Sequence, residues 1–120
     1  MRIFLFAAVA ILAVAGAASA QTGAEIFQRC AGCHSVAAGV VDTPGPNLVG
    51  LIGRKAGSQP GASDAMKAAG DKGLVWSEAT LDKFLDDPYA AVPDNGMEFS
   101  GLERAPDRKA VIDYLKSAPH

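Results

Sequence analysis

The hydrophobic positions of this chain follow helical spacing in several short stretches, and no convincing alternation of period two occurs anywhere. Ile26, Phe27 and Cys30 share one face of a predicted first helix, Ala24–Cys33. A last helix is predicted over Asp107–Ser117, and its apolar face consists of Ala110, Val111, Tyr114 and Leu115. These patterns predict an all-α fold.

Two further helices are predicted from capping residues. Ser63 is a candidate N-cap for a helix over Asp64–Ala69. Ser77 and Thr80 are both candidate starts for the next helix, which Pro88 ends. The apolar positions of that helix are Leu81, Phe84 and Leu85.

Long segments rich in glycine and proline separate these helices. The first covers Val36–Pro60, where Leu48–Ile52 is the one candidate for a helical turn, and the second covers Asp87–Pro106. Aromatic residues make up only 7% of the chain, which is few for a domain that must build its own core. Loops of this length are hard to order without a cofactor.

The N-terminus has the layout of a secretory signal peptide. Arg2 precedes the apolar run Ile3–Val14, and Ala18-Ser19-Ala20 supplies the small residues that an exporting peptidase reads. A retained membrane anchor is the alternative, but the run is shorter than the roughly 20 residues that span a bilayer. We expect a signal peptide over 1–20 and a mature domain over 21–120.

Charge and length narrow the function further. A chain of 120 residues with a net charge of -2 suits one small domain and shows no basic stripe for nucleic acid. Removal of residues 1–20 takes away one basic side chain, Arg2, and no acidic one, so the mature domain is slightly more acidic than the full chain. An exported domain would lie where thiols tend to become disulfides, so its cysteines are informative.

The chain has two cysteines, and they form the sequence Cys30-Ala-Gly-Cys33-His34. This is the attachment pattern of c-type haem. Positions three apart lie on one helical face, so both thiols can form thioethers with one haem edge while His34 turns its ring towards the iron.

The cysteine pair has three other interpretations. A redox dithiol usually opens a helix after a strand, and no strand pattern precedes Cys30. A zinc site lacks a second cysteine pair, and the other histidine is the terminal His120. A structural disulfide is the third possibility. We expect one covalent haem c.

A second axial ligand would come from a methionine. Met66 lies inside a predicted helix, where packing is the usual role of methionine. Met97 lies in a loop, which can bring a thioether over a metal without disturbing a helix. Loop packing is the alternative role for Met97, and spacing alone does not decide between the two.

Several short motifs follow one another along the chain: Gly23–Phe27 before Cys30, Pro46–Leu48, Gly50–Gly57, Trp76–Leu81, Asp87-Pro88, Met97–Gly101 and Tyr114–Lys116. In order and spacing, these motifs resemble class I cytochromes c of the mitochondrial type and their bacterial periplasmic relatives. The resemblance covers essentially all of Gly23–Lys116. It implies a small haem-enclosing fold in which the N- and C-terminal helices cross.

The resemblance also implies roles for single residues. His34 and Met97 would be the axial ligands of the iron, and the Pro46 carbonyl would accept a hydrogen bond from the other ring nitrogen of His34. Arg54 and Trp76 would donate hydrogen bonds to a haem propionate.

Gly23 and Phe27 would cross the last helix near Val111 and Tyr114, as in the family. Gly23 suits this role because a residue without Cβ lets two backbones approach closely.

The chain departs from the family at several positions. Phe84 stands where the family often has a tyrosine whose hydroxyl forms a hydrogen bond with the methionine sulfur. The segment Gly61–Asp64 lacks the tyrosine that, in the family, helps to hold a haem propionate. Tyr89, Ala90 and Gly96 occupy positions of the lysines that ring the family's haem edge. These departures leave the partner surface and the redox tuning open.

Charges around the predicted ligand loop differ from the family as well. In ferric members a lysine of this loop replaces the methionine as pH rises, but here no lysine occurs between Lys83 and Lys109. The segment Asp86–Arg104 has five acidic side chains and one basic side chain.

The sequence therefore predicts a periplasmic electron carrier that is not an enzyme. Its partners would be redox proteins that dock transiently, with no nucleic acid, no membrane span in the mature form, and a monomeric state. One alternative is an enzyme or gas sensor in which Met97 is off the iron. The other is a redox subunit that stays docked to a larger enzyme.

Overall fold

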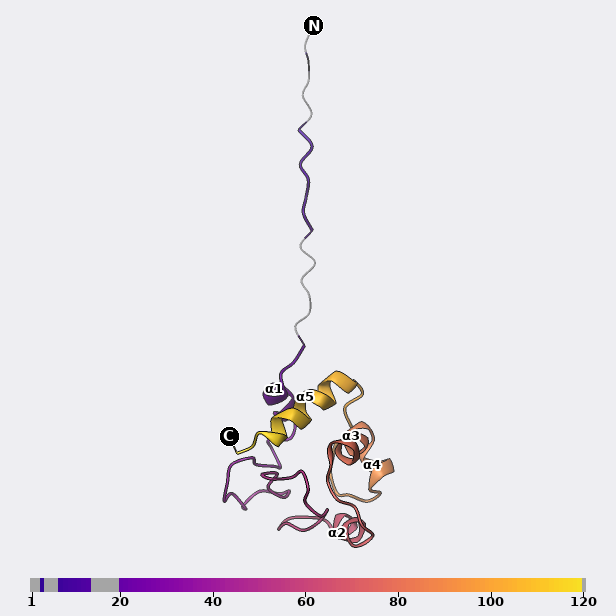
Figure 1. The fold of residues 1–120 in the computed structure, drawn as a ribbon. Helices are drawn as coiled ribbons and strands as arrows, with labels where there is room; N and C mark the ends of the chain where they lie inside the picture. The colour runs from indigo at the N-terminus through magenta and orange to yellow at the C-terminus, as the bar shows by residue number, and fades with distance from the viewer. Residues whose placement is uncertain (1–2, 4–6, 14–19, 120) are drawn as a thin grey trace.

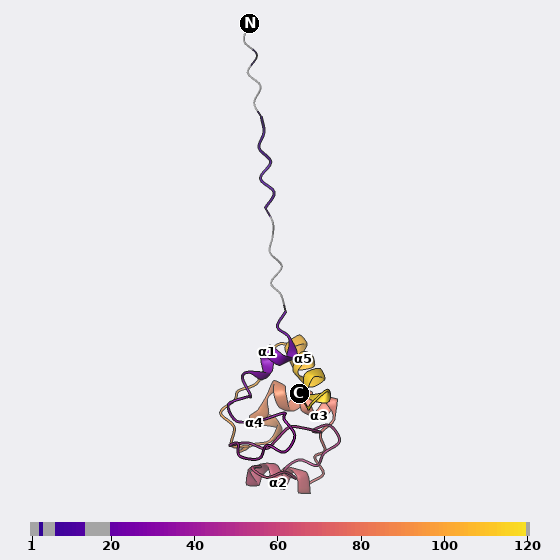
Figure 2. The same cartoon turned by 90° about the vertical axis from the view of Figure 1, so that its left-hand side faces the viewer.

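The computed structural model describes residues 3, 7–13 and 20–119. Five helices occur in this part of the chain: α1 (Gly23–Phe27), α2 (Asp64–Asp71), α3 (Glu78–Asp86), α4 (Pro88–Ala91) and α5 (Ala105–Lys116). Strands are absent from the described residues, and Lys55 and Val75 form one isolated antiparallel bridge. The all-α prediction is confirmed. Figures 1 and 2 place α1 and α5 together at one end of the domain and α2 at the other.

Two predicted helices have different ends in the structure. The first helix stops at Phe27 instead of Cys33, because the amide of Cys30 bonds to the Phe27 carbonyl three residues earlier (2.8 Å) and the chain continues in turns. The last helix begins at Ala105 instead of Asp107, because proline is tolerated in a first helical turn and Pro106 stands there.

The capping residues act as predicted. The Ser63 hydroxyl accepts the Met66 amide (3.1 Å) and begins α2, which runs two residues beyond the predicted end. Ser77 is the N-cap of α3, and Thr80 completes a capping box by accepting the Ser77 amide (2.8 Å).

The two predicted loops differ from expectation in one element each. Asp87–Pro106 contains the short helix α4, whose first turn is capped by the Asp87 carboxylate at 3.1 Å from the Ala90 amide. Leu48–Ile52 forms turns instead of a helix. There, the Val49 carbonyl accepts a hydrogen bond from the Arg54 guanidinium instead of from a helical amide.

The described part of the N-terminal stretch does not pack on the domain (Figure 1). Ile3, Val9, Ile11 and Leu12 are between 79% and 88% exposed. The predicted cleavage site after Ala20 falls partly outside the described residues, since 14–19 are not described. No helix in the described part of the chain has the length and apolar composition to cross a bilayer.

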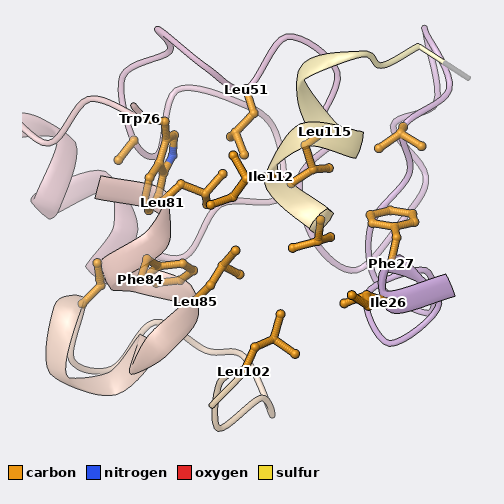
Figure 3. Packing of buried hydrophobic residues seen from close by; sticks show 14 residues of the cluster. Ile26, Phe27, Leu51, Trp76, Leu81, Phe84, Leu85, Leu102, Ile112 and Leu115 are labelled. Atoms are coloured by element: carbon orange, nitrogen blue, oxygen red, sulfur yellow. The ribbon is translucent and has the colours of Figure 1, made fainter. Parts of the chain in front are cut away.

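The core joins the helices to the long loops. Figure 3 shows side chains of α1, α3 and α5 pointing towards one another, together with Leu51, Trp76 and Leu102 from the loops. Burial of one such aliphatic or aromatic side chain contributes about 1.5–3 kcal/mol. The loops are therefore held by the same apolar cluster that packs the helices.

The terminal helices cross at a glycine, as the resemblance implies. A Cβ on Gly23 would lie 2.2 Å from the Ala110 carbonyl oxygen and 2.7 Å from the Tyr114 Cβ. The Phe27 and Tyr114 rings pack beside this crossing with centroids 5.4 Å apart. Only glycine permits this approach of α1 to α5.

We predict that Gly23→Ala lowers the free energy of unfolding of the haem-loaded protein by about 1–3 kcal/mol, because the new methyl group forces the helices apart. Urea denaturation followed by circular dichroism measures this change. Ala24→Ser is the matched control, because it adds one atom at an exposed position of the same helix. Equal effects of the two substitutions would contradict the crossing described above.

Candidate haem-binding site

The cysteine segment follows directly from the end of α1. Its turns are closed by the His34 amide, which bonds to the Cys30 carbonyl at 2.9 Å. Both thiols are free; Cys30 is half-buried against the core and Cys33 is exposed. Burial raises the pKa of the Cys30 thiol, and the nearby Arg29 opposes this with a smaller effect. A raised pKa does not suit a redox dithiol, whose attacking cysteine is activated by a lowered pKa.

The His34 ring is fixed by the loop that follows. Its Nδ1 lies 2.7 Å from the Pro46 carbonyl oxygen. Because a carbonyl can only accept, Nδ1 carries the proton, and the lone pair for a metal is on Nε2. This is the hydrogen bond that the resemblance implies between these two residues.

Gly45 brings the loop close enough for that bond. Its amide donates to the Cys33 carbonyl at 2.8 Å, and a Cβ on Gly45 would lie 2.6 Å from the Cε1 atom of His34. Asn47 holds the same loop, since its amide group donates to the carbonyls of Ala37 (2.7 Å) and Val40 (2.8 Å).

Arg54 and Trp76 lie side by side. The Trp76 backbone amide donates to the Arg54 carbonyl at 2.9 Å, and the Trp76 ring is buried in an edge-to-face pair with the Phe84 ring. The Arg54 guanidinium donates to the carbonyls of Val49 (3.1 Å) and Asn47 (2.8 Å).

The charge of Arg54 is only partly compensated. Burial lowers the pKa of the guanidinium, and none of the acidic side chains in the described ranges forms an ion pair with it. A half-buried cation without an acidic partner among the described residues therefore suits an anionic group such as a propionate.

Met97 and Met66 are both half-buried and both pack against the core. Met66 belongs to α2, whereas Met97 belongs to a loop held by its own backbone contacts. The Met97 amide donates to the Asn95 side-chain oxygen at 2.8 Å, and the Met97 carbonyl accepts from the Tyr89 hydroxyl.

These donors fit a haem. Two unpaired thiols three residues apart can form thioethers, the His34 Nε2 can ligate iron, and the sulfur of a methionine could supply a second iron ligand. A zinc site is not supported by the described residues, which contain no group of three His, Cys, Asp or Glu side chains placed to hold a metal ion. The fold and donors define a small all-α protein of the c-type cytochrome class.

Comparison with known proteins places the chain within that class. The family model described as Cytochrome c matches residues 20–119. The chain is 43% identical over 97 residues to cytochrome c2 of Afifella marina, with 79% of this chain and 78% of that protein covered. It is 42% identical over 100 residues to cytochrome c of Arabidopsis thaliana, with 81% and 87% covered. The chain belongs to the cytochrome c family, and its cofactor is one covalently bound haem c.

Residue by residue, the structure joins His34 to Pro46 and Arg54 to Trp76. The predicted roles of Cys30, Cys33, His34, Met97, Pro46, Arg54 and Trp76 at the haem are not tested by these contacts and stay predictions. Sequence reasoning missed Gly45 and the side chains of Asn47 and Asn95. The Pro-Gly-Pro sequence around Gly45 was the available signal for a close approach.

We predict that Arg54→Gln lowers the free energy of unfolding of the holoprotein by about 1–3 kcal/mol, because two charged hydrogen bonds to loop carbonyls are lost. Denaturation in urea at neutral pH gives the value. Its matched control is Lys55→Gln, whose ion pair with Asp71 is solvent-exposed and worth about 1 kcal/mol or less. If Lys55→Gln destabilises the protein as much as Arg54→Gln, the guanidinium does not brace this loop.

Proposed function

We propose that this c-type cytochrome is a soluble periplasmic electron carrier whose haem iron is ligated axially by His34 and Met97. Membership of the cytochrome c family supports the general conclusion that the chain transports electrons. The hydrogen bond between His34 Nδ1 and the Pro46 carbonyl is the observation that best supports ligation by His34. It holds the proton on Nδ1, so that the unprotonated Nε2 points away from the loop and is free to bind iron.

Haem iron supplies reversible one-electron chemistry when bound. The protein's contribution is to occupy both axial positions with its own side chains, so that a substrate finds no open position. The Met97 thioether is a soft donor that favours the ferrous state and raises the reduction potential. Cys30 and Cys33 would hold the haem covalently, while Arg54 and Trp76 would donate to a propionate. A carrier that is not an enzyme follows from this arrangement.

Export is the second part of the proposal. The exposed apolar residues Ile3, Val9, Ile11 and Leu12 do not pack on the domain, as expected of a segment read by an export system and cleaved after Ala20. The mature domain over 21–120 would act as a monomer that docks transiently with redox proteins. Because the predicted ligand loop, 87–101, contains acidic residues such as Asp87, Asp94 and Glu98, we expect slow and weakly salt-dependent reactions with acidic partners.

The proposed ligand set predicts different effects of two methionine substitutions. Met97→Ala should turn the low-spin ferric spectrum into a high-spin or ligand-exchanging one, because the thioether leaves the iron. Met66→Ala is the control and should leave the visible spectrum unchanged, since Met66 packs in α2. A high-spin ferric haem in Met66→Ala, with Met97→Ala remaining low-spin, would overturn the assignment.

Alkaline pH gives a second test. We predict that hydroxide, and not a lysine, replaces Met97 when it leaves the ferric iron, because 87–101 contains no amine side chain. Lys83 lies on α3, which would have to unwind for its amine to reach the iron. Magnetic resonance through an alkaline titration identifies the incoming ligand. Signals of a lysine-ligated low-spin haem that vanish in Lys83→Ala would show that α3 does open.

A further inference from the structure

The backbone of Met97 forms hydrogen bonds on both its amide and its carbonyl side, and both partners are anchored at α4. On the carbonyl side, the Tyr89 hydroxyl donates to the Met97 carbonyl oxygen. On the amide side, the Met97 N–H donates to the side-chain oxygen of Asn95 at 2.8 Å. Tyr89 belongs to α4, at a position where the resemblance to the family implies a lysine.

Asn95 connects the amide side to α4. Its side-chain nitrogen donates to the carbonyls of Pro88 (3.1 Å) and Val92 (3.0 Å), which are the first residue of α4 and the residue after its end. Asn95 is only 4% exposed, so these bonds are shielded from water. One buried side chain therefore satisfies two carbonyls of α4 and positions the Met97 amide.

The helix α4 is itself fixed in the core. Pro88 is fully buried and Val92 is 3% exposed, and the Asp87 carboxylate caps the helix. Movement of Met97 away from its position must break its bonds to Tyr89 and Asn95, or must carry α4 with it and expose Pro88 and Val92. Either route costs free energy that a methionine in an unrestrained loop would not require.

We propose that Tyr89 and Asn95 are positioning residues that keep Met97 on the haem iron by tying its peptide groups to α4. This proposal rests on the axial ligation by Met97 proposed above. The two residues stabilise the state in which Met97 is ligated, and they lower the population of the open state that an external ligand can enter.

Binding of free imidazole to the ferric holoprotein at neutral pH measures that open population. An external ligand binds an iron position only in the fraction of molecules from which Met97 has moved, so its apparent affinity reports this fraction. Tyr89→Phe removes one hydrogen bond at the surface and should tighten apparent imidazole binding roughly two- to ten-fold. Asn95→Ala should tighten it further.

Tyr114→Phe is the matched control, because it removes the chain's other tyrosine hydroxyl, at the crossing of α1 and α5. This substitution should leave imidazole affinity as in the wild type. Because Tyr89 is 46% exposed, Tyr89→Phe keeps the test available if Asn95→Ala does not yield folded holoprotein.

A double substitution shows whether Tyr89 acts through the ligand. In a Met97→Ala background the iron position is already open, so adding Tyr89→Phe should leave imidazole affinity unchanged. The proposal is overturned if Tyr89→Phe binds imidazole as the wild type does, or if it tightens binding equally in the Met97→Ala background. If Met97→Ala itself binds imidazole no more tightly than the wild type, the axial ligation fails instead.

Discussion

The His34 ring is oriented by one short hydrogen bond from its Nδ1 to the Pro46 carbonyl, and the other contacts of this side of the site follow from it. The bond requires the Pro46 loop to pass directly beside the ring. Gly45 permits that approach, since a Cβ there would lie 2.9 Å from Nδ1. A carbonyl acceptor on Nδ1 fixes the tautomer and raises the basicity of Nε2.

The same loop continues to the predicted propionate residues. The Asn47 side chain donates hydrogen bonds to the backbone carbonyls of Ala37 and Val40 in the same loop. The Asn47 backbone carbonyl accepts a hydrogen bond from the Arg54 guanidinium. Trp76 is joined to Arg54 through the backbone. His34, Arg54 and Trp76 are therefore joined in one hydrogen-bonded framework, in which the imidazole and the guanidinium take part through their side chains and Trp76 takes part through its backbone. The Met97 side is built separately, from α4 and Asn95.

The sequence predicted those features that depend on neighbouring residues. Helical spacing and the Ser63 and Ser77 caps identified α2 and α3. The crossing at Gly23 was expected from the resemblance, and the absence of a Cβ suits it physically. The short helix α4 was missed, because four residues give no periodic pattern.

Long-range contacts were less accessible from the sequence. The roles of Gly45 and Asn47 depend on partners that only the folded loop brings near, and a side chain such as Asn95 shows its three hydrogen bonds only when α4 is in place. The pairing of His34 with Pro46 was expected from the resemblance, and not from residue spacing.

The central claim is that the protein itself fills both axial positions of the iron. Addition of carbon monoxide to the ferrous wild-type holoprotein at neutral pH tests this claim most directly, because the gas binds only an iron with an open position. With His34 and Met97 both ligated, the visible spectrum should remain that of the ferrous protein without the gas. Rapid and complete formation of a carbon monoxide adduct would contradict the account and would indicate a five-coordinate haem.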